Sequence, residues 1–355
     1  MTNGERKPLL ALTLGDPAGI GPEIVAAACA APEVHRWCRP VVVGHPEMVR
    51  RAIALRQTSA TVRVIGEVEQ ADPSPAQVAC LATGSDEVLD APAGEIDGRS
   101  GQAAYEAIVA AAELALAGRI DGLVTAPLHK QALHEAGHHY PGHTELLAEM
   151  CGVDDFAMML YLGPEEPIRG PAGLAVVHVT LHTAMRNVFE EMTSAEVLAK
   201  AHLAHAFMLR MKGEAPKIGV CALNPHGGEG GLFGREELDV IRPAIEAGLA
   251  EGLDLEGPLP ADTVMIRARN GEFDAVVAMY HDQGHIALKL LGMHRAVNVT
   301  LGLPIVRTSV AHGTAFDLAW KGRAEVGSMI EAIRVAVRLC DGCQGSEFGV
   351  QGLIS

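Results

Sequence analysis

The amino-acid sequence predicts a three-layer α/β/α protein with a mostly parallel sheet and two lobes. Short apolar runs alternate with longer segments of helical period along almost all of the 355 residues. Alternating βα units of this kind favour a parallel sheet with helices on both faces. The apolar runs are rich in Val, Ile and Ala, which is typical of strands buried on both faces. The chain is also long enough for two lobes with separate cores.

The expected elements follow from these runs in order along the chain. Short apolar runs predict strands at residues 8–14, 40–44, 61–65, 120–125, 157–162, 173–180, 217–222, 274–280 and 296–300. Apolar residues at helical spacing predict helices at residues 22–31, 101–117, 193–212, 235–249 and 324–340. Ser100 and Thr193 stand where helix N-caps belong. Thr193-Ser194-Ala195-Glu196 also has the spacing of a capping box.

Two stretches rich in proline and glycine predict loops rather than flexible linkers. They are residues 67–99 and 163–173, and the second separates two apolar runs that could pair as a hairpin. Discontinuous lobes are therefore expected. Residues 1–130 and 292–355 would form the first lobe, and residues 131–291 would form the second.

Composition excludes several classes of partner. The formal net charge is −16, which argues against nucleic acid or an anionic membrane surface. No apolar run approaches the roughly 18 residues needed to span a bilayer, and the run at 9–14 is too short for a signal peptide, so a cytoplasmic protein is expected. The seven cysteines are scattered and odd in number, which fits reduced thiols. The Cys340–Cys343 motif lacks the second ligand pair that a structural zinc site needs.

Three histidines each follow an apolar run that is expected to be a buried strand: His182, His226 and His281. Open α/β sheets bind ligands outside the carboxyl ends of their strands, so the three imidazoles could converge on one crevice. Three neutral imidazoles with an open coordination position form a catalytic site for a divalent metal. Any one of them alone would more often be a helix cap or a core histidine. Their three equivalent contexts favour the metal site.

Residues at helix starts and strand ends indicate an anion site. The stretch 15–23 follows the first strand and opens a helix, where glycines let backbone N–H groups approach an anion, although a tight structural turn fits equally well. It matches neither the G-x-G-x-x-G fingerprint nor the P-loop. His143 and Thr144 begin another helix and suit a phosphate group or a simple N-cap. Three further side chains could bind the same phosphate group: Lys289, Asn298 and Arg307. The guanidinium of Arg307 can donate two parallel hydrogen bonds to it.

The residues leave the general acid or base open. Asp262 could cap the next helix, or it could stand beside the metal and relay a proton. Lys130 and His129 are further candidates, and no local feature of the sequence decides among the three.

Taken together, these segments resemble the 4-hydroxythreonine-4-phosphate dehydrogenase family from about residue 8 to about residue 335. The matching motifs are Gly-Asp-Pro-Ala-Gly-Ile-Gly-Pro-Glu (15–23), Thr-Ala-Pro-Leu-His-Lys (125–130), Pro-Gly-His-Thr-Glu (141–145), Leu-Asn-Pro-His-Gly-Gly-Glu-Gly (223–230), Gly-Pro-Leu-Pro-Ala-Asp-Thr (257–263), Ala-Met-Tyr-His-Asp-Gln-Gly (278–284) and Asn-Val-Thr-Leu-Gly-Leu-Pro (298–304). The resemblance implies an isocitrate/isopropylmalate dehydrogenase-like fold with the active-site cleft between two lobes.

The resemblance also implies roles for individual residues. The metal would be Zn, Co, Ni, Fe or Mg, held by His182, His226 and His281 in a site shared across a homodimer interface. The phosphorylated substrate would be bound by His143, Thr144, Lys289, Asn298 and Arg307. The reaction would be NAD- or NADP-dependent oxidation of the C3 hydroxyl, followed by decarboxylation of the β-keto acid. The resemblance does not assign the acid/base, for which Asp262 and Lys130 are the candidates that we retain.

Some motifs depart from the biosynthetic members of the family. Thr180–Arg186 differs from their metal-ligand stretch, which makes His178 a rival of His182, although the register against Arg186 favours His182. Stretches including 284–289 and 315–320 look more like a branch that converts D-threonate or D-erythronate 4-phosphate to dihydroxyacetone phosphate and CO2. The biosynthetic substrate, 4-hydroxy-L-threonine 4-phosphate, gives 3-amino-2-oxopropyl phosphate and CO2 instead.

Three other functions remain as alternatives. A third relative of the family oxidises the cis-dihydrodiol formed from terephthalate, a substrate without phosphate, and the retained phosphate residues argue against it. A metal-dependent hydrolase would also use three histidines, but it would turn over without a dinucleotide. A non-catalytic protein that only binds metal and phosphate would form no NADH.

Overall fold

The computed structural model describes residues 6–341 and divides the chain into two compact units. Unit 1 contains Met1–Asp154 and Leu303–Ser355, and unit 2 contains Asp155–Gly302. The sequence predicts boundaries after residues 130 and 291, and both observed boundaries lie later in the chain. The first moves because Leu146 and Leu147 belong to the hydrophobic core of unit 1.

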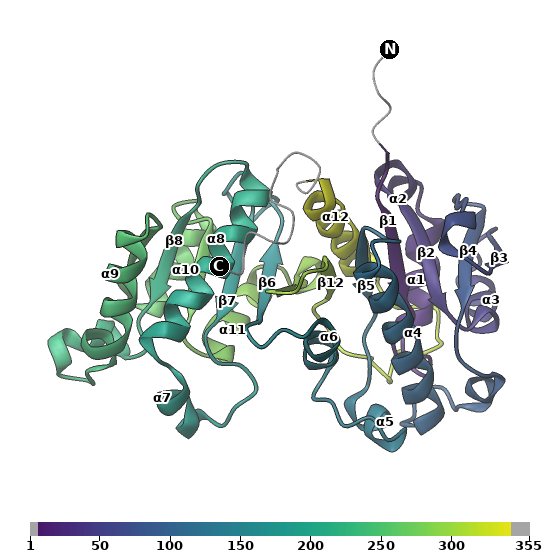
Figure 1. The fold of residues 1–355 in the computed structure, drawn as a ribbon, viewed down its shortest axis with the longest axis horizontal. Helices are drawn as coiled ribbons and strands as arrows, with labels where there is room; N and C mark the ends of the chain where they lie inside the picture. Colours follow the sequence, from purple (N-terminus) through teal and green to yellow (C-terminus); the bar gives the residue numbers. More distant parts are fainter. Residues whose placement is uncertain (1–5, 342–355) are drawn as a thin grey trace, which may run out of the picture. The chain divides into compact units, whose positions relative to one another are not determined.

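Unit 1 contains an entirely parallel set of strands in the order β3-β4-β2-β1-β5-β12 (Figure 1). The strands are β1 (Leu9–Thr13), β2 (Arg39–Gly44), β3 (Thr61–Ile65), β4 (Gln77–Ala82), β5 (Gly122–Thr125) and β12 (Arg307–Val310). The helices of this unit are α1 (Gly21–Ala30), α2 (Pro32–Trp37), α3 (Pro46–Leu55), α4 (Gly98–Leu116), α5 (Lys130–Glu135), α6 (His143–Cys151) and α12 (Gly327–Asp341).

The period of two along each strand explains how unit 1 buries both faces of its sheet. Leu9 and Ala11 of β1 join Ile108 of α4 in one core cluster. Leu10 and Leu12 alternate with them and are also fully buried, so they serve the opposite face. Strands of this kind read as continuous apolar runs, which is the pattern that predicts a parallel sheet.

Unit 2 contains strands in the order β11-β6-β7-β10-β8-β9. The strands are β6 (Ala157–Leu162), β7 (Leu174–His178), β8 (Lys217–Cys221), β9 (Asp254–Leu259), β10 (Ala275–Ala278) and β11 (Val297–Leu301), and the helices are α7 (Val188–Glu191), α8 (Ser194–Lys212), α9 (Arg242–Ala250), α10 (Ala261–Arg269) and α11 (His281–Gly292). β6 runs antiparallel to both β7 and β11. β6 and β7 pair as a hairpin although residues 163–173 separate them in the sequence. The remaining pairs are parallel.

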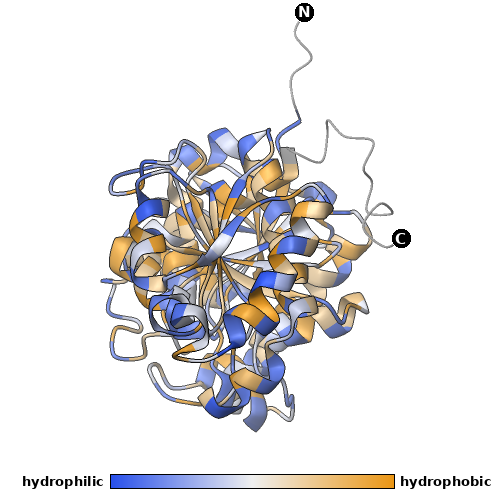
Figure 2. Cartoon of the chain, turned by 90° about the vertical axis from the view of Figure 1, so that its left-hand side faces the viewer, coloured by the Kyte–Doolittle hydropathy of each residue, from blue (hydrophilic) through white to orange (hydrophobic). Residues whose placement is uncertain are grey.

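This architecture confirms the predicted α/β fold class with a mostly parallel sheet. Figure 2 shows hydrophobic strands surrounded by helices that mix hydrophobic and hydrophilic turns. No helix among residues 6–341 combines the length and apolar character that crossing a membrane requires.

Three strands escaped prediction, and one helix cap was misplaced. β4 lies inside the expected loop 67–99, while β9 contains Gly257 and Pro258 and lacks a strand-like composition. β12 begins with Arg307 and contains further polar residues, so its composition does not indicate a strand, although all four of its residues are buried. The N-cap of α4 is Asp97, whose carboxylate accepts from the Arg99 N–H, and not Ser100. Thr193 does cap α8, with its hydroxyl accepting from the Glu196 N–H at 3.2 Å.

Candidate functional site

Four imidazoles gather at the end of β7 and the start of α11 in unit 2. His281 is the first residue of α11, and its ring centroid lies 6.0 Å from that of His182 and 6.1 Å from that of His178. His285, one helical turn further on, stacks on His281 with the ring centroids 3.7 Å apart and an interplanar angle of 13°. Residues four apart on a helix share one face, which explains this stack.

His226 lies apart from these rings on an unusual loop. Residues 226–230 of the segment Pro225–Gly231 all have positive φ, with values of 54° at His226 and 42° at Glu229. With this backbone conformation, Nδ1 of His226 lies 2.9 Å from Oε1 of Glu229, and the His226 side chain is 69% exposed. The imidazole also makes an edge contact with Phe233.

Two of the three predicted metal ligands share one local arrangement. Nδ1 of His226 lies 2.9 Å from Oε1 of Glu229, and Nδ1 of His281 lies 2.6 Å from Oδ1 of Asp282. A carboxylate only accepts, so each ring donates from Nδ1 and presents Nε2 outward. Metal-binding histidines are typically held in this way by a carboxylate on the other nitrogen.

The predicted trio is not assembled within one chain. Among residues 6–341, no group of three His, Cys, Asp or Glu side chains is placed to hold a metal ion. The structure brings His182 and His281 together and leaves His226 elsewhere. His178, the rival of His182, is fully buried, and both of its ring nitrogens have protein partners. His178 is therefore a core histidine with both ring nitrogens occupied by protein partners.

Burial keeps the inner imidazoles neutral. Desolvation lowers the pKa of His178 to about 4, and the nearby His281 and His182 lower it further, while a hydrogen bond to Met158 opposes the shift. Desolvation also lowers the pKa of His285 to about 2, with contributions from His178, His281 and Lys289. At neutral pH both rings are therefore uncharged.

Unit 1 holds a buried cationic site formed by β5, α6 and β12. The Arg307 side chain is on the first residue of β12, is 2% exposed and donates from Nη2 to the Thr125 hydroxyl at 2.7 Å. Burial lowers its pKa to about 10, and the charge of Glu145 opposes that shift, so the guanidinium stays protonated at pH 7. A protonated guanidinium in this setting is suited to a phosphate group.

His143 and Thr144 stand beside this arginine at the start of α6. Burial, followed by the charge of Arg307, holds the pKa of His143 well below its usual range, and a hydrogen bond with the Ala126 backbone opposes the shift. Nε2 of His143 is buried and has no hydrogen-bond partner. Thr144 is 9% exposed in the first turn. The Thr144 hydroxyl and the backbone N–H groups at this helix N-terminus are donors suited to an anion.

The predicted phosphate residues are divided between the two units. Lys289 and Asn298 belong to unit 2, whereas the other three belong to unit 1. Within unit 2, Lys289 acts electrostatically on His285. The Oδ1 atom of Asn298 is buried without a hydrogen-bond partner, so this amide is available to a ligand.

The acid/base candidates also lie in different units. Lys130 is exposed at the start of α5 and lies beside Gly142, next to His143. His129 caps that helix by accepting from the Ala132 N–H at 3.4 Å and stacks on Phe316. Asp262 is exposed in the first turn of α10, where Pro260 is the N-cap, so it does not cap that helix.

The glycine-rich stretch after β1 contains a buried acid that sequence patterns did not single out. Asp16 is 0% exposed, and Oδ1 accepts from the Ala18 N–H at 2.9 Å. Burial raises its pKa to about 7, the Ala18 and Ser100 hydrogen bonds oppose the shift, and Asp97 adds to it. The turn is also close-packed, since a Cβ on Gly15 would lie 2.2 Å from the Pro127 carbonyl oxygen.

Replacing Asp16 with asparagine is expected to change how stability depends on pH. The native pKa of about 7 exceeds the ordinary aspartate pKa of 3.8, so the native state binds the proton more tightly and wild-type stability falls as pH rises between these two values. Asparagine cannot ionise. The change in the free energy of unfolding caused by Asp16→Asn, relative to the wild type, should therefore be more favourable at pH 8 than at pH 4. The difference between the two pH values is expected to be up to about 4 kcal/mol. Urea unfolding at both pH values measures the difference.

The matched control for this prediction is Asp72→Asn, because Asp72 is exposed in the same unit. Equal pH dependence in the wild type and in Asp16→Asn would show that Asp16 has an ordinary pKa.

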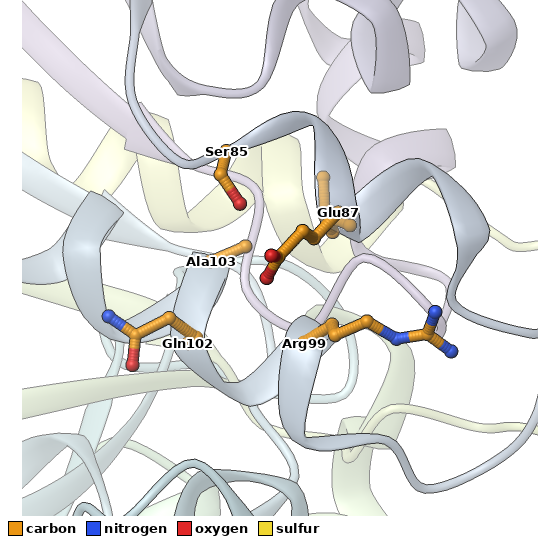
Figure 3. Close-up of a pocket in the computed structure, with 6 residues that line it drawn as sticks. Ser85, Glu87, Arg99, Gln102 and Ala103 are labelled. Atoms are coloured by element: carbon orange, nitrogen blue, oxygen red, sulfur yellow. The ribbon is translucent and has the colours of Figure 1, made fainter.

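A small pocket in unit 1 lies apart from these residues. It is lined by Ser85, Glu87, Val88, Arg99, Gln102 and Ala103 and has a volume of about 20 Å³ (Figure 3). That space suits about one water molecule. Its lining includes none of the predicted site residues, and it is too small for a substrate.

Comparison with known proteins identifies the family. A profile of the pyridoxal phosphate biosynthetic protein PdxA matches residues 36–336. The D-threonate 4-phosphate dehydrogenase of Pectobacterium atrosepticum is 43% identical over 93% of this chain and 99% of its own length. The 4-hydroxythreonine-4-phosphate dehydrogenase of Beijerinckia indica is 46% identical over 93% of this chain and 94% of its own.

Solved structures agree with this result. A 4-hydroxythreonine-4-phosphate dehydrogenase from Klebsiella pneumoniae superposes with a TM-score of 0.83 at 41% identity, covering 94% of this chain and 100% of its own. A terephthalate 1,2-cis-dihydrodiol dehydrogenase from Burkholderia xenovorans gives 0.63 at 30% identity, covering 94% and 98%. The resemblance that the sequence motifs predict is confirmed, and the chain belongs to the PdxA family.

Proposed function

We propose that this chain is a dehydrogenase that oxidises the C3 hydroxyl of a four-carbon hydroxy acid carrying a 4-phosphate, with loss of CO2 from the resulting β-keto acid. The observation that carries the proposal is the buried, protonated Arg307 beside His143 in unit 1. Dehydrogenases named for 4-phosphorylated substrates match this chain over more than nine-tenths of its length.

The proposed metal ligands are His182, His226 and His281. Their support is the chemistry of the donors, because Glu229 and Asp282 hold the Nδ1 atoms of two rings and leave each Nε2 free to coordinate. Imidazole ligands suit Zn, Co, Ni or Fe, and Mg can bind if oxygen ligands complete the shell. NAD or NADP is the proposed redox cofactor.

A homodimer would complete this metal site. Within one chain His226 lies apart from the other two ligands, so in this proposal ligands from two copies combine. Exposed apolar side chains close to the histidines along the chain support an interface: Leu290 and Ile286 of α11 are 82% and 58% exposed, and Leu232 after the His226 loop is 71% exposed. Apolar surface of this kind typically marks a binding surface.

Each part of the chain then has one task in the reaction. Arg307, His143 and Thr144 hold the phosphate from unit 1, while Lys289 and Asn298 contribute from unit 2. When bound, a divalent metal supplies Lewis acidity for the hydroxyl and for the charge left by loss of CO2, and the nicotinamide supplies the hydride acceptor. Lys130 and Asp262 are the proposed groups that take the hydroxyl proton and return one to carbon.

We infer that the C2 substituent of the substrate is a hydroxyl, because the motifs at 284–289 and 315–320 resemble those of the sugar-acid branch more than those of the biosynthetic branch. The scattered free thiols among the described residues are compatible with the cytoplasm as the site of the reaction.

Initial rates of NADH or NADPH formation test the proposal. D-threonate 4-phosphate, D-erythronate 4-phosphate and 4-hydroxy-L-threonine 4-phosphate are compared on metal-reconstituted enzyme, and the highest kcat/KM is expected with one of the first two. A preference for the amino substrate would place the enzyme in pyridoxal phosphate synthesis. Turnover of the terephthalate cis-dihydrodiol alone would contradict the phosphate site. Turnover without a dinucleotide would indicate a hydrolase.

A further inference from the structure

His178 and His285 form a hydrogen-bonded imidazole pair directly behind His281. His178 ends β7 with no exposed surface, and His285 is 6% exposed on α11. Nδ1 of His285 lies 3.0 Å from Nε2 of His178. Neither ring has a task in the reaction proposed above, yet both are among the most deeply buried polar groups of unit 2.

One backbone carbonyl fixes the direction of the whole hydrogen-bond chain. Nδ1 of His178 lies 3.3 Å from the Met158 carbonyl oxygen, which can only accept, so His178 carries its proton on Nδ1. Nε2 of the neutral His178 ring is then an acceptor, and His285 must donate to it from Nδ1. His285 therefore keeps a single tautomer and a single ring orientation.

Close packing of α11 on β7 makes this contact possible. A Cβ on Gly284 would lie 2.6 Å from Nε2 of His178 and 2.6 Å from Cγ1 of Val176. Only glycine lets the helix approach so closely that His285 reaches His178. The pair is thus built into the junction between the strand and the helix.

The orientation of His285 passes on to His281 through the stacked rings. The two planes are nearly parallel, 13° apart, with centroids 3.7 Å apart. Asp282, whose side chain is 67% exposed, holds only the Nδ1 edge of His281. Because the exposed carboxylate can move with the ring, this hydrogen bond alone does not fix the rotation of His281 about its Cβ–Cγ bond, whereas a stacked neighbour restrains that rotation.

We propose that His285, anchored by His178, is a positioning residue for the metal site, because its ring fixes the plane in which His281 presents Nε2 to the metal. The inference rests on the proposed ligand role of His281. Groups that orient a metal ligand typically contribute about 10- to 100-fold in metal affinity, and His285 takes that role from the face of the ring.

Titration of metal-free protein with Co²⁺, followed by visible absorption without substrate, tests this role. His285→Leu removes both the stack and the hydrogen bond, and its apparent Kd is expected to rise about 10- to 100-fold. His285→Phe keeps an aromatic face over His281 and is expected to lie between His285→Leu and the wild type. It also serves if the leucine variant does not fold. The matched control is His202→Leu, a change at an exposed histidine of α8, and this variant should bind Co²⁺ like the wild type.

Two further measurements separate positioning from simple stabilisation and from failure of the metal site itself. Imidazole ¹⁵N NMR of the wild type should show both His178 and His285 as neutral Nδ1–H tautomers. An unchanged Kd in both His285 variants, or a Kd in His285→Phe equal to that in His285→Leu, would overturn the inference while leaving the metal site intact. If His281→Ala also binds Co²⁺ like the wild type, the proposed metal site is wrong and the inference falls with it.

Discussion

His281→Ala is expected to lower kcat/KM for the phosphorylated substrate by about 10³-fold or more and to remove the dependence of the rate on divalent metal. A catalytic metal contributes several kcal/mol of transition-state stabilisation, and about 4 kcal/mol corresponds to 10³-fold in rate. Alanine removes the imidazole that Asp282 holds at 2.6 Å. Initial rates as a function of Co²⁺ or Zn²⁺ concentration, after chelator treatment, measure both effects.

A mixing experiment adds a test of the shared site. If ligands from two copies combine, mixing His281→Ala with His226→Ala should restore part of the activity, since a mixed dimer contains one site with both histidines intact. His202→Ala, which changes an exposed histidine paired with Glu251, should behave like the wild type. A His281→Ala enzyme within about threefold of wild-type activity would contradict the metal-ligand role. Inactive mixtures would contradict the shared arrangement.

Arg307→Met is expected to lower kcat/KM for the 4-phosphorylated substrate by about 10²- to 10³-fold, mainly through KM. Hydrogen bonds to charged groups contribute roughly 1.5–3 kcal/mol each, and a guanidinium can offer a phosphate two. Arg307→Lys keeps the charge but loses the fork, so a smaller loss is expected. Rates with the phosphorylated substrate and with its unphosphorylated analogue, measured for each variant, separate phosphate binding from chemistry.

The unphosphorylated analogue makes this prediction specific. The wild type and Arg307→Met should use it equally poorly, because neither could gain from the missing phosphate. A matched control is Arg235→Met, which removes an exposed arginine paired with Asp239. If Arg307→Met loses activity equally on both substrates, Arg307 supports the fold or the chemistry rather than the phosphate.

Most of the strands that sequence patterns predicted are buried on both faces by Val, Ile, Leu and Ala, as β1 and β10 are, whereas the largely exposed β3 was predicted from its Val and Ile residues. β12 was missed because it begins with Arg307, whose burial depends on Thr125 of a strand far away in the sequence. Local composition cannot report such a partner. β9 was missed for the same reason. Its Gly257 lies so close to β8 that an added Cβ would be 2.7 Å from the Val220 carbonyl oxygen, and local composition does not report this contact either.

In the candidate site too, local motifs predicted some residues, whereas contacts between residues far apart in the sequence could not be predicted. Motifs predicted that His143 and Arg307 bind the same phosphate group, and the structure places the two residues close together in unit 1. They did not reveal His285 as a partner of His178, because that contact depends on the approach of α11 to β7 at Gly284. Nor did they reveal the raised pKa of Asp16, which arises mainly from burial, with a contribution from the charge of Asp97.

The discontinuity of unit 1 has a consequence for the order in which a growing polypeptide acquires its binding sites. Thr125 and Arg307 are 182 residues apart in the sequence, and all of unit 2 is synthesised between them. Domains generally fold as units during synthesis, starting from the N-terminal end. Unit 2 is contiguous and can fold while β5 still lacks β12. Arg307, the proposed phosphate-binding residue, is therefore synthesised after all of the proposed metal ligands in unit 2, so a nascent chain would complete the proposed phosphate site last.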